Sequence, residues 1–151
     1  ANADAILFTC SAFGPAIEAA AKAVNVPVLK PNEAMLEEAL ESGARLALLA
    51  TFAPTLPSMN EELRQLAKHA GKTLQCEDVF IPGAMDALAA GHAEQHDAAI
   101  AAAAKATQGG MLLLTQFSMA RAAQRVREAT RSPVLTSPDS AVRKLRRVLG
   151  F

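Results

Sequence analysis

One cysteine, Cys10, lies where the sequence could make a thiol reactive. Residues 5–14, AILFTCSAFG, run from an apolar segment through Cys10 to Gly14 and Pro15, which is typical of a short buried strand, a tight turn and the start of a helix. The first free N–H groups of a helix carry partial positive charge, which favours a thiolate over a thiol. We therefore expect Cys10 to serve as a base, an acid or a nucleophile. A cysteine that only packs against the helix is the alternative, and for a single cysteine it is the more common case.

The same arrangement occurs a second time further along the chain. In residues 111–120, MLLLTQFSMA, Gln116 takes the place of Cys10, an offset of 116 − 10 = 106 residues. At this offset the segment Pro133-Val134-Leu135 falls on Pro27-Val28-Leu29, and both segments continue into a helix pattern. A repeat of this kind determines the fold. It predicts two equivalent units, related by a pseudo-two-fold axis, with Cys10 and Gln116 at corresponding strand ends.

The elements that must position these residues alternate along the chain. Apolar strand patterns are followed by helix patterns of about 10–15 residues, which predicts βαβ crossovers, parallel sheets and an α/β fold. We expect strands at 4–9, 27–29, 45–51 and 73–79 and from 111 onward, and helices at 15–24, 32–41, 58–71, 84–91 and 93–107.

Polar residues follow the predicted strands at their carboxyl ends, where open α/β sheets bind ligands. Short hydroxyl groups and exposed helix N-termini suit a carboxylate, and the amide of Gln116 can donate to a carboxylate or carbonyl oxygen. Taken singly, such a hydroxyl is more often a helix cap. Together they predict a substrate site around Cys10, made of Thr9, Ser11, Ala12, Thr51, Thr55, Ser58, Thr115, Gln116, Phe117 and Ser118. Phe13, Phe52 and Phe80 lie near strand ends too and form either an apolar wall or core.

Composition argues against several other functions. Lys plus Arg and Asp plus Glu number 15 each, and Trp and Tyr are absent, so neither a strong charge field nor aromatic platforms favour binding to nucleic acid. The basic cluster at 143–147 is interpreted as a solvated helix face. No CxxC or HExxH pattern predicts a metal site, and Cys76 is interpreted as core. No apolar run is long enough to span a membrane, and we expect a cytoplasmic protein.

Four segments, DAILFTCSAFG, PVLKPNEAMLEEAL, RLALLATFAPTLPS and MLLLTQFSMARA, together resemble the aspartate/glutamate/hydantoin racemase superfamily. That superfamily includes amino-acid and hydantoin racemases, maleate isomerase and arylmalonate decarboxylase. The resemblance covers nearly the whole chain. It implies two Rossmann-like lobes with parallel sheets and a site in the cleft between them. It also implies that neither a metal nor an organic cofactor is needed, and that the protein forms a homodimer.

The repeat and the resemblance also predict lobe boundaries. Residues 1–44 with 132–151 are expected to form the first lobe, and residues 45–131 the second. The second unit has residues 45–108 ahead of its core strand, whereas the first unit has only residues 1–4. If the two units are complete copies, roughly sixty residues should precede Ala1.

The resemblance implies proton transfer at the carbon next to a carboxylate. In the racemases two cysteines face each other across the substrate, and one takes a proton while the other donates one. By motif match Cys10 occupies the first of these positions, but Gln116 occupies the second and cannot transfer protons in this way. We therefore expect single-sided chemistry by Cys10 on a small carboxylate or cyclic imide, namely isomerisation, decarboxylation or one-base proton exchange. The alternatives are a family member that binds a small carboxylate without turnover, and a two-base racemase with another partner, for which the sequence offers no candidate.

Overall fold

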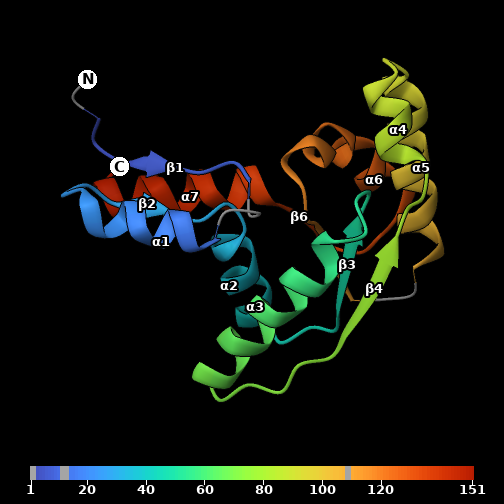
Figure 1. Ribbon diagram of the computed structural model, residues 1–151. Helices are drawn as coiled ribbons and strands as arrows, with labels where there is room; N and C mark the ends of the chain where they lie inside the picture. Colours follow the sequence, from blue (N-terminus) through green and yellow to red (C-terminus); the bar gives the residue numbers. More distant parts are fainter. Residues whose placement is uncertain (1–2, 11–13, 108–109) are drawn as a thin grey trace.

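The computed structural model describes residues 3–10, 14–107 and 110–151, and its strands form two sheets (Figure 1). The smaller sheet pairs β1 (Ile6–Leu7) with β2 (Val28–Leu29). The larger sheet has the order β4-β3-β5-β6 and consists of β3 (Leu46–Ala50), β4 (Cys76–Phe80), β5 (Met111–Leu114) and β6 (Val134–Thr136). Each of these pairings is parallel, which confirms the predicted α/β class.

Helices follow the strands as the alternation predicts. They are α1 (Gly14–Ala23), α2 (Glu33–Ser42), α3 (Thr55–His69), α4 (Ala84–Ala89), α5 (Ala93–Ala106), the 3₁₀ helix η2 (Phe117–Ala122), α6 (Ala123–Ala129) and α7 (Ser137–Leu149). Within the described ranges, none of these helices has the length and apolar character needed to cross a membrane.

The predicted start of one helix was wrong, because α3 begins at Thr55 and not at residue 58. The turn that precedes the helix already satisfies its first donors, since the N–H of Thr55 donates to the Phe52 carbonyl and that of Leu56 to the Ala53 carbonyl. Pro57 then falls in the first turn, where a backbone N–H has no partner within the helix, so the missing donor costs little.

The central strand β3 is buried on both faces because helices cover the larger sheet on either side (Figure 1). Side chains alternate between the two faces of a strand. Ala47 and Leu49 pack into a cluster with α5 and α6, whereas Leu46, Leu48 and Ala50 pack into a second cluster with α2 and α3. This explains the continuous apolar run of the sequence there, as expected for a parallel strand between two helical layers.

The repeat is visible in the pairing of the strands. In the small sheet Ile6 lies opposite Val28 and Leu7 opposite Leu29. In the large sheet Leu112 lies opposite Val134 and Leu113 opposite Leu135, which are the same pairs displaced by the 106-residue offset. The offset also carries α2 onto residues 139–148 of α7. The two units therefore share both their elements and their register, and the ends of β1 and β5 are equivalent positions.

The two equivalent helices α2 and α7 contact each other through charged side chains. Arg143 donates from Nε and Nη2 to the two carboxylate oxygens of Glu38, at 3.0 and 2.6 Å. The hydroxyl of Ser140 donates to the same carboxylate at 2.8 Å, and Lys144 donates to Glu37 at 2.8 Å. Hydrogen bonds from Arg143, helped by Ser140 and opposed by burial, hold the pKa of Glu38 below its ordinary value near 4.5.

We predict that Glu38→Gln lowers the free energy of unfolding by about 1 kcal/mol at pH 7, because it removes a partly buried charge pair. A carboxyl whose pKa is lowered in the folded state contributes stability above its unfolded pKa and loses that contribution as the pH falls through the folded pKa. The difference between Glu38→Gln and the unaltered protein should therefore vanish below roughly pH 4. Urea unfolding across this pH range measures it.

Glu41→Gln is the matched control, since Glu41 lies exposed near the end of the same helix. A loss of stability in Glu38→Gln that stays constant down to low pH would contradict the assignment of the effect to the charge pair.

Candidate active site

A cavity of about 480 Å³ lies at the carboxyl ends of β1 and β5, beside the segments that follow β2 and β3. Of the predicted site residues, it brings together Thr9, Cys10, Thr55, Ser58, Thr115, Gln116, Phe117 and Ser118. Ser11 and Ala12, also predicted, lie outside the described residues, as does Phe13. The cavity thus joins residues 9–10 to residues 115–118, the equivalent ends of the two repeated strands.

Cys10 is exposed and lines this cavity in the segment that follows β1. The strand is held in place by backbone bonds to the β2 segment, from the N–H of Ile6 to the Pro27 carbonyl (2.8 Å) and from that of Phe8 to the Leu29 carbonyl (3.1 Å). An exposed thiol beside a cavity is accessible to a small ligand, which is what a cysteine base or nucleophile requires.

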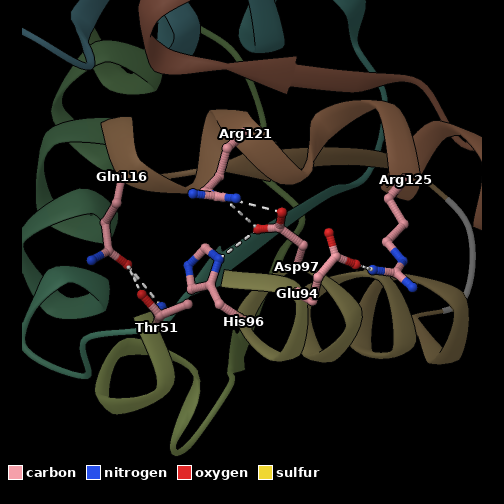
Figure 2. Close-up of polar contacts among 7 residues, drawn as sticks. All are labelled: Thr51, Glu94, His96, Asp97, Gln116, Arg121 and Arg125. Carbon is pink, nitrogen blue, oxygen red and sulfur yellow. Dashed lines mark hydrogen bonds and ion pairs between the residues drawn. The ribbon is translucent and has the colours of Figure 1, made fainter. Parts of the chain in front are cut away.

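Gln116 is held by Thr51 across the ends of β3 and β5 (Figure 2). The backbone N–H of Thr51 donates to Oε1 of Gln116 at 2.7 Å, and the Thr51 hydroxyl donates to the same oxygen at 3.1 Å. Because a backbone N–H can only donate, the amide oxygen of Gln116 must face Thr51. Its NH₂ group faces away, as Figure 2 shows, and the Gln116 side chain is available to the cavity as a donor.

Thr51 was predicted to bind substrate, but the structure gives it a different position. Its side chain is buried and does not line the cavity. Its hydroxyl and N–H are both used to orient Gln116. Thr115 lines the cavity but is buried too, and its hydroxyl donates to the Leu49 carbonyl at 2.8 Å. Both threonines therefore fix the strand ends, and the donors exposed to a ligand come from their neighbours.

The prediction missed several lining residues, which are Pro31, Asn32, Pro54 and Met85; Phe52 was anticipated as an apolar wall. Phe80, proposed for that wall, is 46% exposed at the end of the edge strand β4 and does not line the cavity. Asn32 lies in the short segment between β2 and α2, and its place just past a strand end was a signal that would have found it. Met85 lies on α4, and its position depends on tertiary packing that no local pattern encodes.

The described lining residues carry hydroxyls, amides, a thiol and apolar groups, and they include no Asp, Glu, Lys, Arg or His. Among the described residues, no group of three or more His, Cys, Asp and Glu side chains is placed to hold a metal ion. A ligand oxygen in this cavity would therefore meet neutral N–H and O–H donors beside an apolar wall.

A polar network around the buried residues His96 and Asp97 holds Arg121 of the 3₁₀ helix η2 (Figure 2). The same helix carries Phe117 and Ser118. Arg121 of η2 donates from Nε to both carboxylate oxygens of Asp97, at 3.0 and 3.1 Å, and Nδ1 of His96 contacts Asp97 at 2.8 Å. Burial by itself raises the pKa of Asp97, but hydrogen bonds from His96 and Arg121 outweigh it and hold the pKa below its ordinary value. Asp97 is thus an ionised acceptor, and Nδ1 of His96 must carry the hydrogen.

We predict that Asp97→Ala lowers the free energy of unfolding by about 1–3 kcal/mol, because it leaves a buried donor without an acceptor. His96 is fully buried, and its Nε2 has no partner in the described part of the chain, so Asp97 supplies the hydrogen bond that its ring makes. Urea unfolding at pH 7 measures the effect. Glu94→Ala is the control, since Glu94 pairs with Arg125 from an exposed position on the same helix (Figure 2). Equal losses in both variants would contradict the role given to the buried network.

Cys76 has surroundings unlike those of Cys10. It is half-buried on β4, and burial, with the nearby charge of Asp78, raises the pKa of its thiol to about 11. A thiol with that pKa is ionised to roughly one part in a thousand at pH 8. The sequence analysis interpreted Cys76 as core, and the structure places it partly buried against the apolar cluster of α2 and α3.

We predict that iodoacetamide at pH 8 alkylates Cys10 well before Cys76, since the thiolate is the species that reacts and Cys10 is exposed. Peptide mass spectrometry after a short exposure measures both positions. In a Cys10→Ala variant the remaining thiol is Cys76, and labelling should reach one equivalent only after urea unfolds the protein and exposes it. Similar rates at the two cysteines in the folded protein would contradict the prediction.

Comparison with known proteins shows the family and the fold of the chain. The Asp/Glu/hydantoin racemase family model matches residues 1–110. Glutamate racemase isoform RacE1 from Bacillus anthracis has a similar structure, with a TM-score of 0.66 and 15% identity over 97% of this chain and 58% of that one. Allantoin racemase from Klebsiella pneumoniae gives a TM-score of 0.64 and 23% identity over 99% of this chain and 60% of that one.

At these identities the two structures show the fold, and this chain spans about three fifths of the length of either. No curated protein matches the sequence. The two-lobe fold of these neighbours and the family match over residues 1–110 lead to one conclusion: the chain belongs to the Asp/Glu/hydantoin racemase family.

Proposed function

We propose that this chain belongs to a cofactor-independent enzyme that acts at the carbon next to a carboxylate of a small acid, or at the equivalent carbon of a cyclic imide, through the single cysteine Cys10. One observation supports this most directly. Cys10 and Gln116, at equivalent strand ends of two repeated units, line the same cavity. The first repeated unit therefore contributes a thiol to the cavity, and the second contributes a carboxamide donor.

In this mechanism the thiolate of Cys10 takes the proton from the carbon, and the electron pair left behind spreads onto the adjacent carboxylate or carbonyl oxygens. Such a carbanion is high in energy unless donors are aimed at those oxygens in a water-poor site. Gln116 offers its NH₂ group, and Thr55, Ser58 and Ser118 offer hydroxyls. For a decarboxylation, the thiol instead returns a proton to the carbon after CO₂ has left.

The chemistry is single-sided because Gln116 neither accepts nor releases a proton near neutral pH. Exchange follows when the Cys10 thiol trades the abstracted proton for one from water before returning a proton to the same face. After loss of CO₂, the thiol gives its proton to that face of the carbanion and is left as a thiolate. Isomerisation of a double bond uses Cys10 as a nucleophile: the thiolate adds to one carbon, the resulting single bond rotates, and the C–S bond breaks to restore the double bond and the thiolate. Racemisation through two opposed thiols would need a second acid at Gln116.

A second candidate function is binding of a small carboxylate without turnover. It is favoured by the contacts of Gln116, whose oxygen is fixed by two donors from Thr51 and whose NH₂ group is therefore a permanent hydrogen-bond donor. A rigid donor suits binding as well as it suits catalysis. The two functions differ in whether Cys10 is needed.

We predict that Cys10→Ala lowers turnover at least about a hundredfold, the usual contribution of a general acid or base. The panel consists of L-glutamate and allantoin for proton exchange in deuterated water, maleate for isomerisation and phenylmalonate for decarboxylation, each followed by proton NMR. Cys76→Ala is the matched control and should keep full activity, since Cys76 lies outside the cavity.

Turnover that Cys10→Ala leaves unaltered would reject the cysteine mechanism. Binding of a panel compound in a thermal-shift assay, without turnover and without any effect of Cys10→Ala, would favour the second candidate. Deuterium incorporation with inversion at the carbon would instead indicate a two-base racemase.

We also propose a homodimer, as the family resemblance implies, and a cytoplasmic protein with no nucleic-acid or membrane partner, as the composition suggests. The basic side chains Arg143 and Lys144 support the absence of a nucleic-acid partner, because both are paired with glutamates of α2. Light scattering tests the dimer. The lobe boundaries at 44/45 and 131/132 stay a prediction. Residues 134–136, which that prediction assigns to the first lobe, form β6 and pair with β5 in the sheet built by residues 45–131.

A further inference from the structure

Asn32 occupies a helix start but does not cap the helix. It is the residue before α2, and asparagine at this position usually accepts a hydrogen bond from a backbone N–H of the first turn. Here the side chain makes no such bond and is only 2% exposed. The side chain makes other contacts in place of the cap that the local sequence favours. Such departures from local preference are expected at functional sites.

The contacts of Asn32 determine which way its amide points. The hydroxyl of Ser137 donates to Oδ1 at 2.6 Å, and Nδ2 contacts the sulfur of Met59 at 3.0 Å. A thioether sulfur has no hydrogen to donate, so the amide nitrogen and not the oxygen must face it. The orientation of Asn32 is therefore fixed from both ends.

The amide nitrogen of Asn32 is poorly satisfied. It carries two hydrogens, and the acceptor that the described residues provide is the weakly accepting sulfur of Met59. Asn32 also lines the cavity that holds Cys10 and Gln116. A buried N–H without a good acceptor is unfavourable, and a ligand oxygen in the cavity would relieve it.

Asn32 and Gln116 share one design. Each is a carboxamide that lines the cavity, and each has its oxygen held by donors of the protein, from Ser137 in one case and Thr51 in the other. They come from the two different repeated units. With their oxygens occupied, both can offer a ligand only N–H.

We propose that Asn32 is a ligand-binding residue that donates an N–H to an acceptor oxygen of the bound molecule, either a carboxylate or an amide carbonyl, together with Gln116. The inference deepens the proposed function by adding a binding residue, but it does not require Cys10 to perform chemistry.

The test uses phenylacetate and phenylacetamide, which have nearly the same shape and differ in charge. Their ring suits the apolar wall of Phe52, Met85 and Phe117. Side-chain amide resonances of the ¹⁵N-labelled 151-residue chain are followed during titration, and Asn32→Asp assigns the Asn32 pair. We expect the Asn32 and Gln116 pairs to shift with the same dissociation constant. The Asn60 pair should stay in place, because its NH₂ group is already held by Asp78.

Asn32→Asp is the informative variant because the carboxylate still accepts from Ser137 but has no N–H. Phenylacetamide should bind it about tenfold more weakly, and since this probe is neutral the loss does not come from charge repulsion. Ser137→Ala is the structural control, which removes the contact but leaves the donors of Asn32; it should lower stability more than affinity.

Two results would overturn the proposal. In the first, the Gln116 resonances shift, the Asn32 resonances do not, and Asn32→Asp binds phenylacetamide with unchanged affinity. Asn32 would then be purely structural, and the proposed function would stay intact. No shift of either carboxamide with either probe would remove the donor role from both. Failure of the cysteine mechanism is separate, since it is read from turnover in Cys10→Ala.

Discussion

The pairing of β5 with β3 is the contact on which the rest of the molecule depends. Leu48, Leu49, Leu113 and Leu114 are fully buried where these strands run side by side, and each buried leucine is worth about 1.5–3 kcal/mol. The contact continues past the strand ends. The hydroxyl of Thr115 reaches the Leu49 carbonyl, and Thr51 reaches Gln116. These hydrogen bonds hold Thr115 and Gln116, which line the cavity, in fixed positions relative to the core strands.

Most of the architecture could be predicted because it follows from patterns of short range. The alternation of strands and helices needs only the apolar periodicity, and the repeat needs only an offset that keeps Pro27 over Pro133. The register then confirmed that offset in both sheets. The pattern did not predict the start of α3 at Thr55, because the turn at 52–55 supplies acceptors for the first N–H groups of the helix.

The site was predictable to the extent that strand ends determine it. Thr9, Cys10, Thr115 and Gln116 follow strands directly and line one cavity. Thr51 also follows a strand, but whether a threonine faces a ligand or a neighbouring side chain depends on a contact with a residue 65 positions away. Met85 does not stand directly at a strand end, and the place of α4 beside the cavity depends on its packing against α5. Long-range packing is thus the part that one sequence does not reveal.

The two units have the same backbone arrangement and differ in what they place at equivalent positions. At the first strand end stands Cys10, exposed and ionisable in principle; at the second stands Gln116, with its oxygen held by a backbone N–H. Asn32 adds a second carboxamide from the loop beside the cysteine. A symmetric pair of thiols would treat the two faces of a substrate alike. Among the described lining residues, the thiol of Cys10 is the one group that can take up a proton near neutral pH, and the carboxamides and hydroxyls around the cavity can act as hydrogen-bond donors. This asymmetry of side chains on a symmetric frame is the physical argument behind the proposed one-sided chemistry.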